Sequence, residues 1–97
     1  MKYRIELTED AKEDLRWFRA YERQIILEGI KENLANEPLI ETRNRKWLRE
    51  NPLAPWELRI QKYRAFYQVE QGDKVKVGVI GYKEHGILYV QGKEVEI

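Results

Sequence analysis

The sequence predicts an α+β fold, in which an N-terminal strand and a helical hairpin pack on one face of a mainly antiparallel sheet of four or five strands. Two observations carry this prediction. Apolar and polar residues alternate over 3–7 and again from Trp56 onward, which is typical of half-buried strands. Between these segments, apolar residues recur at helical spacing. The 97 residues suffice for one hydrophobic core, so we expect a single domain over 1–97.

The first strand and first helix are predicted from adjacent patterns. Three apolar residues alternate with charged residues over 3–7, and Thr8 then offers a hydroxyl that can cap a helix. The apolar face of this helix consists of Ala11, Leu15 and Phe18. We interpret its carboxylates as cap and surface residues, namely Glu9, Asp10, Glu13 and Asp14.

A second helix follows closely and ends before Pro38, so the two helices should form an antiparallel hairpin. The next segment, 38–55, contains all three prolines and shows no clear period, which indicates an ordered connection with a short helical turn. From Trp56 the period is two. Leu58 and Ile60 then share a side opposite Glu57 and Arg59.

Three more strands complete the predicted meander. In the next strand, Arg64, Phe66 and Gln68 face away from Ala65, Tyr67 and Val69. The valines at 75, 77 and 79 mark a further strand, and the segment ILYV at 87–90 adds a short one. The helices must cover one sheet face to bury their apolar residues, which leaves the other face free for binding or chemistry.

Composition excludes several classes of site. The chain has no cysteine, which excludes disulfides, thiolate catalysis and cysteine-ligated zinc, and His85 alone cannot form a histidine metal site. We therefore expect no metal and no cofactor. No segment approaches the ~20 apolar residues of a membrane span, and the N-terminus lacks the apolar run of a signal peptide. We expect no membrane contact and a cytoplasmic location.

Positive charge is concentrated in one part of the chain. Residues 43–64 contain seven Lys or Arg and two Asp or Glu, a local net charge of +5 in a chain whose total is +1. This concentration predicts a phosphate-bearing or acidic partner. The residues expected to contact such a partner are Arg43, Arg45, Lys46, Arg49, Arg59 and Lys62. The alternative is a solvated basic segment that balances the acidic helices.

The order of elements, the segment YRAFY at 63–67, IGYKEH at 80–85 and a late LY pair together resemble the RelE/ParE toxin superfamily. The resemblance covers nearly the whole chain. It implies a toxin of a type II toxin–antitoxin module, silenced by a cognate antitoxin in a hetero-oligomer. RelE-like members cleave mRNA in the ribosomal A site without a metal, and ParE-like members poison DNA gyrase. A catalytically silent relative that retains antitoxin binding is the third alternative.

The resemblance to the RNA-cleaving branch also implies catalytic residues, and we expect Arg64, Lys83, Tyr89 and His85 to fill these positions. Arg64 would stabilise charge on the phosphorus, and His85 is the one side chain with an ordinary pKa suited to proton transfer near pH 7. Each residue has a structural alternative. Arg64 could pair with Glu57 or Glu70, and Lys83 could be a solvated surface lysine. His85 could be a turn residue, and Tyr89 could be a packing residue.

The chain departs from the RelE pattern at three places. The position two residues before Tyr63, often glycine at the turn, is Gln61 here. RelE-like enzymes often carry paired lysines on the strand before the arginine, where this chain has Trp56 and Glu57. Their late basic residue is commonly arginine, whereas Lys83 lacks the guanidinium fork.

Overall fold

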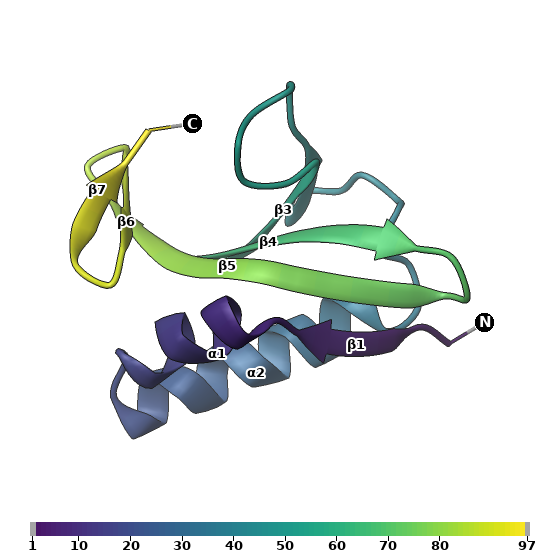
Figure 1. Ribbon diagram of the computed structural model, residues 1–97, viewed down its shortest axis with the longest axis horizontal. Helices are drawn as coiled ribbons and strands as arrows, with labels where there is room; N and C mark the ends of the chain where they lie inside the picture. Colours follow the sequence, from purple (N-terminus) through teal and green to yellow (C-terminus); the bar gives the residue numbers. More distant parts are fainter. Residues whose placement is uncertain (1, 97) are drawn as a thin grey trace.

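The computed structural model describes residues 2–96, which form two helices and seven strands (Figure 1). The helices are α1 (Glu9–Arg16) and α2 (Ala20–Leu34). The strands are β1 (Arg4–Leu7), β2 (Arg45–Trp47), β3 (Trp56–Ile60), β4 (Tyr63–Glu70), β5 (Lys74–Glu84), β6 (Ile87–Val90) and β7 (Lys93–Val95). Neither helix has the length and apolar character that crossing a membrane requires.

All seven strands belong to one sheet. Six of them follow the order β2-β3-β4-β5-β6-β7, in which every neighbouring pair is antiparallel, and β1 lies off this path. β1 pairs in parallel with β5 over 74–77, whereas β6 pairs with β5 over 82–84. Because β4 occupies one edge of β5 from 74 to 82, β1 and β6 share the other edge. The predicted α+β class is confirmed, with β1 added at an edge of the meander.

Both helices cover the same face of the sheet (Figure 1). The core between the helices and the sheet contains Ala11, Leu15 and Phe18, as helical spacing predicted, together with apolar residues of α2 and the inward residues of β3, β4 and β5. Leu58, Ala65 and Tyr67 are fully buried in this core, as the alternating pattern predicted. The Tyr67 hydroxyl donates a hydrogen bond of 2.6 Å to the backbone carbonyl of Pro38, which ties the segment after α2 to β4.

Three features of the fold differ from the sequence predictions. The segment 38–55 contains the three-residue strand β2 and no helical turn, and a further short strand, β7, lies beyond the predicted terminal strand. Asp14 is not a surface residue, because its side chain is buried against β5. It was assigned to the surface because isolated carboxylates on a short helix are usually solvated.

The face opposite the helices is concave. β5 carries a bulge at Gly78, since Phe66 pairs with Val79 while Tyr67 pairs with Val77. The β6–β7 hairpin and the segment between β2 and β3 both stand above this face in Figure 1. Gly81 permits the approach of β6, because a Cβ at this position would collide with the backbone carbonyl of Tyr89.

Candidate functional site

The predicted catalytic arginine lies on the concave face. In the sheet register, Arg64 on β4 stands between Arg59 on β3 and Gly81 on β5, so the three positions share one face. Lys83 follows Gly81 by two residues and projects from the same face. The sheet therefore brings Arg59, Arg64 and Lys83 together on the side that the helices leave open.

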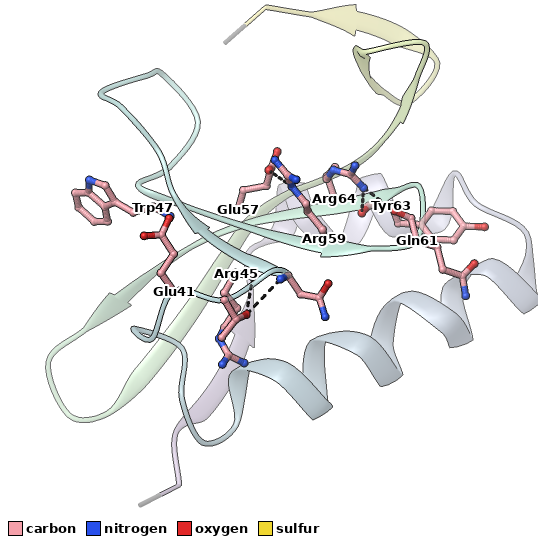
Figure 2. Close-up of polar contacts among 10 residues, drawn as sticks. Glu41, Arg45, Trp47, Glu57, Arg59, Gln61, Tyr63 and Arg64 are labelled. Atoms are coloured by element: carbon pink, nitrogen blue, oxygen red, sulfur yellow. Dashed lines mark hydrogen bonds and ion pairs between the residues drawn. The ribbon is translucent and has the colours of Figure 1, made fainter.

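The guanidinium of Arg64 is held from one side only (Figure 2). Its Nη1 donates to the carbonyl oxygens of Gln61 and Tyr63 at 2.7 and 2.9 Å. Its Nε is buried and has no hydrogen-bond partner among the residues that the structure describes. Partial burial lowers the pKa of Arg64, Glu57 opposes this effect, and Arg59 adds to it. An arginine remains charged despite such a shift, so the site holds a partly desolvated cation with a free N–H.

Glu57 is a carboxylate on this face, and it is buried to 1% exposure. It accepts a hydrogen bond of 3.0 Å from Nε of Arg59 (Figure 2). Glu70 instead lies beside Lys74 and Lys76. Arg64 thus forms no ion pair with either glutamate in the described part of the chain, and the structural alternative for Arg64 is not what the structure shows.

The other predicted basic residues divide into two groups. Lys46 pairs with Glu57 in the register of β2 and β3 and so lies at the margin of the concave face, and Arg43 and Arg49 are exposed on the flanking segments. Arg45 points the other way. Its Nε and Nη1 donate to the carbonyl oxygens of Ile40 and Asn33 at 2.8 and 2.9 Å, and its side chain is buried. Arg45 therefore holds the end of α2 and is not available to RNA.

Lys62 and Tyr89 lie on the helix side of the sheet. The Lys62 ammonium is 5.7 Å from the ring centre of Tyr63 and 5.8 Å from that of Tyr82, both inward-facing residues. Tyr89 pairs with Tyr82 in the register of β5 and β6, and the two rings stack at 5.3 Å. Tyr82 in turn stacks on Trp17 of the helical hairpin. Tyr89 is therefore part of an aromatic stack on the helix side of the sheet and does not face Arg64.

His85 occupies the two-residue turn between β5 and β6. His85 and Gly86 both have positive φ, at 53° and 79°, which fits the turn type that joins tightly paired strands. The His85 side chain is exposed. Of the four predicted catalytic residues, the sheet thus brings together Arg64 and Lys83, while Tyr89 and His85 lie elsewhere.

Glu57 was not among the predicted site residues. The alternation from Trp56 onward places Glu57 beside Arg59, so the sequence contained a signal for it. Within residues 2–96, no group of three His, Asp or Glu side chains is arranged to hold a metal ion.

Comparison with known proteins identifies the family. The family model described as the ParE toxin of the type II toxin–antitoxin system, parDE, matches residues 5–87. The fold is similar to that in the crystal structure of the toxin–antitoxin complex RelBE2 from Mycobacterium tuberculosis, with a TM-score of 0.73 and 23% identity over 86% of this chain and 100% of the other. No curated protein matches the chain. The structural likeness supports the fold, and the model match shows that the chain belongs to the ParE toxin family of type II toxin–antitoxin systems, within the RelE/ParE superfamily.

Proposed function

We propose that this toxin is a ribosome-dependent, metal-independent mRNA endoribonuclease that inhibits translation in the cytoplasm. The observation that carries the proposal is how the guanidinium of Arg64 is hydrogen-bonded and buried. Two backbone carbonyls fix its Nη1, while its Nε is buried and keeps an unused hydrogen-bond donor among the described residues. A cation that is fixed before substrate arrives, and that still has hydrogen-bonding capacity, suits recognition of a phosphate.

The reaction requires few groups. The 2′-oxygen of a nucleotide attacks the adjacent phosphorus, a bond from this oxygen to phosphorus forms, and the bond from phosphorus to the 5′-oxygen breaks. The products carry a 2′,3′-cyclic phosphate and a 5′-hydroxyl. Arg64 would donate to the phosphoryl oxygens as negative charge gathers on them, and one such contact lowers the barrier by about 3 kcal/mol.

Lys83 and Arg59 supply the remaining positive charge on this face. Lys83, as an ammonium, can donate the proton that the departing 5′-oxygen requires. The Nε of Arg59 already donates to Glu57, which holds the guanidinium beside Arg64. We therefore assign Arg59 to the phosphate next to the one that is cleaved. The 2′-hydroxyl proton would pass to solvent, because Glu57 is buried beside Arg59.

The flanking basic residues would attract ribosome-bound mRNA without regard to its sequence. Arg43, Lys46 and Arg49 lie beside the concave face and are at least partly exposed. Such contacts act through phosphate charge and weaken steeply as salt concentration rises. A cognate antitoxin would inhibit the toxin by forming a hetero-oligomer with it. The solved complex that this fold resembles, a toxin–antitoxin complex, supports such a partner.

A second candidate function is inhibition of DNA gyrase without RNA cleavage. Two findings favour it. Tyr89 and His85 do not join Arg64, which leaves the concave face with few groups for proton transfer. The matched family model is that of ParE toxins, the branch that the sequence resemblance connects with gyrase.

Expression of the toxin from an inducible promoter tests these functions. Primer extension on transcripts after induction should reveal cuts in phase with codons, and Arg64→Ala should abolish the cuts while Arg64→Lys retains part of the activity. A His85→Gln variant serves as the matched control and should cleave like wild type. Inhibition of gyrase supercoiling by purified toxin, without transcript cuts, would overturn the ribonuclease proposal. Unimpaired growth on expression without antitoxin would contradict both toxin mechanisms.

A further inference from the structure

The concave face carries a buried carboxylate among its cations. We propose that Glu57 attenuates this face: its negative charge offsets part of the positive charge of Arg59 and Arg64, and so keeps the affinity for free RNA low. RNA would then be cleaved efficiently only where the ribosome presents it. The inference rests on the proposed function, because it concerns regulation of the same site, but its central measurement is RNA binding and requires no cleavage.

Glu57 lies among the basic residues of the face. In the sheet register its neighbour on β2 is Lys46, and its neighbour on β4 is Phe66. Arg64 precedes Phe66 by two residues and is therefore the diagonal neighbour of Glu57, within reach of a long side chain. Arg59 follows Glu57 by two residues on the same side of β3. Three cationic residues thus adjoin the carboxylate.

Water screens this carboxylate very little. Glu57 is 1% exposed, and the ring of Phe66 beside it is fully buried. A charge in such surroundings acts on its neighbours through an effective dielectric well below that of water. Its influence reaches the second arginine, since burial lowers the pKa of Arg64 and the negative charge of Glu57 counteracts this effect. The carboxylate would oppose a phosphate bound at either arginine in the same way.

The ion pair also divides the guanidinium of Arg59. Its Nε donates to Glu57 at 3.0 Å, although 42% of the arginine side chain is exposed (Figure 2). An arginine can bind a phosphate in a bidentate manner either through Nε and one Nη or through both Nη atoms. Glu57 occupies the first of these edges. The hydrogen bond therefore limits the geometry of phosphate binding in addition to reducing the charge.

A weakened basic face favours RNA that is already held in place. Free RNA must obtain its binding free energy from contacts with the toxin, and these are mainly contacts to phosphates. Messenger RNA on the ribosome is positioned by the ribosome, so the toxin has less translational and rotational freedom of the RNA to restrict. Glu57 would thus suppress binding of free RNA more than cleavage of RNA that the ribosome presents.

Glu57→Gln tests the inference directly, because the amide keeps the size of the side chain and an acceptor for Arg59 but has no charge. Glu57→Ser removes the same charge with a smaller side chain and provides a second test if the glutamine variant does not fold. Glu57→Asp retains the charge and controls for altered packing. Glu28→Gln is matched for net charge, since Glu28 is exposed on α2, on the opposite side of the sheet. Thermal unfolding establishes which purified variants are folded.

RNA affinity is measured with a short single-stranded 2′-O-methyl oligonucleotide, which lacks the 2′-hydroxyl that cleavage requires. We expect Glu57→Gln and Glu57→Ser to bind roughly tenfold more tightly than wild type at low salt, because a weakly screened negative charge is removed beside the phosphates. Their affinity should also fall more steeply with salt concentration. Glu57→Asp and Glu28→Gln should bind within about threefold of wild type, since the first keeps the charge and the second removes a screened one.

The free energy of unfolding should change in the opposite direction. Glu57→Gln leaves Arg59 and Arg64 without their counter-charge, so we expect this variant to unfold more easily while it binds RNA more tightly. A residue that only stabilised the fold would not raise the affinity. Wild-type affinity in a folded Glu57→Gln or Glu57→Ser variant would overturn the proposal, and so would an equal gain in Glu28→Gln, because net charge alone would then explain it.

Cleavage of free RNA in the absence of ribosomes tests the link to ribosome dependence. Glu57→Gln should cut an unmodified single-stranded RNA faster than wild type does. An unchanged rate in a variant that binds this RNA more tightly would contradict that link. If neither protein cleaves RNA with or without ribosomes while the gain in affinity is observed, the proposed function fails and the effect of Glu57 on RNA binding stands.

Discussion

The carboxylate of Asp14 on α1 accepts a buried hydrogen bond of 3.0 Å from the backbone N–H of Ile80, 66 residues further along the chain. Ile80 lies between the part of β5 that pairs with β1 and the part that pairs with β6, so no strand satisfies its N–H on that edge. The same carboxylate accepts a 2.8 Å hydrogen bond from Nε2 of Gln91 in the β6–β7 turn. α1 thus closes the gap in the sheet edge and anchors the C-terminal hairpin.

Asp14→Ala should therefore lower the free energy of unfolding more than a substitution at an exposed position of the same helix does. The substitution leaves the N–H of Ile80 buried without a partner, and losing a charged acceptor of this kind costs about 3 kcal/mol. Urea denaturation at neutral pH measures the loss. Asp10→Ala, on the exposed side of the same helix, is the matched control and should change the free energy of unfolding by less than about 0.5 kcal/mol. Equal stability of the two variants would show that Asp14 is not the required acceptor.

Arg45→Met should destabilise the protein without a direct effect on RNA affinity. The change leaves the carbonyl oxygens of Asn33 and Ile40 without their donors, and we expect a loss of about 2 kcal/mol. Arg43→Met removes an exposed charge from the same segment. This variant should weaken the salt-dependent attraction to RNA while leaving the free energy of unfolding unchanged. Urea denaturation and RNA binding at several salt concentrations distinguish the two. A large affinity loss in folded Arg45→Met would contradict this assignment.

The sequence predicted the faces of the central strands well because the alternation of side chains is a local property of an extended backbone. Glu57 and Arg59 were separated correctly from Leu58, and Arg64 from Ala65, before any tertiary contact was considered. Helical spacing likewise identified the residues of α1 that enter the core and most of those of α2, although Leu27, an apolar residue of the predicted second helix, is exposed. These predictions needed only periods of two and of about 3.6 residues.

The less accurate predictions depended on contacts between distant segments. Alternation in β6 shows that Leu88 and Tyr89 face opposite ways, but pairing with β5 decides that Tyr89 joins Tyr82 behind the sheet. Arg45 lies within a basic segment and resembles its neighbours in sequence, and only the carbonyls at the end of α2 draw it inward.

Tyr63 and Glu22 predict a loss of stability at alkaline pH. The Tyr63 hydroxyl donates a 2.8 Å hydrogen bond to Glu22, and burial together with this bond raises the pKa of Tyr63 from 10.0 to about 12. A tyrosine whose pKa is higher in the folded state contributes fully below pH 10, and its contribution disappears as the pH rises towards 12. At pH 7, Tyr63→Phe should lower the free energy of unfolding by about 1 kcal/mol.

The difference in stability between wild type and Tyr63→Phe should therefore shrink as urea denaturation is repeated from pH 9 to pH 12. Tyr21→Phe, which alters an exposed tyrosine, controls for the general effect of base. On the acid side, partial burial opposes the shift, but the Tyr63 hydrogen bond, the Arg19 backbone and Lys62 lower the pKa of Glu22. The Glu22 contribution is thus present at neutral pH and is lost as the pH falls through this lowered pKa. A pH-independent difference would refute the pairing.

Gly81→Ala should displace the C-terminal hairpin. A Cβ at Gly81 would collide with the carbonyl of Tyr89, and because the obstacle is backbone it cannot move aside as a flexible side chain would. We expect a loss of about 1–3 kcal/mol, as for other overpacked sites. Gly78→Ala is the matched control on the same strand, since its added methyl group meets no atom within 4 Å, and its stability should equal or exceed that of wild type. Hydrogen exchange should show faster exchange in β6 and β7 of Gly81→Ala alone. Unchanged protection there would mean that β6 does not need the close approach that glycine allows.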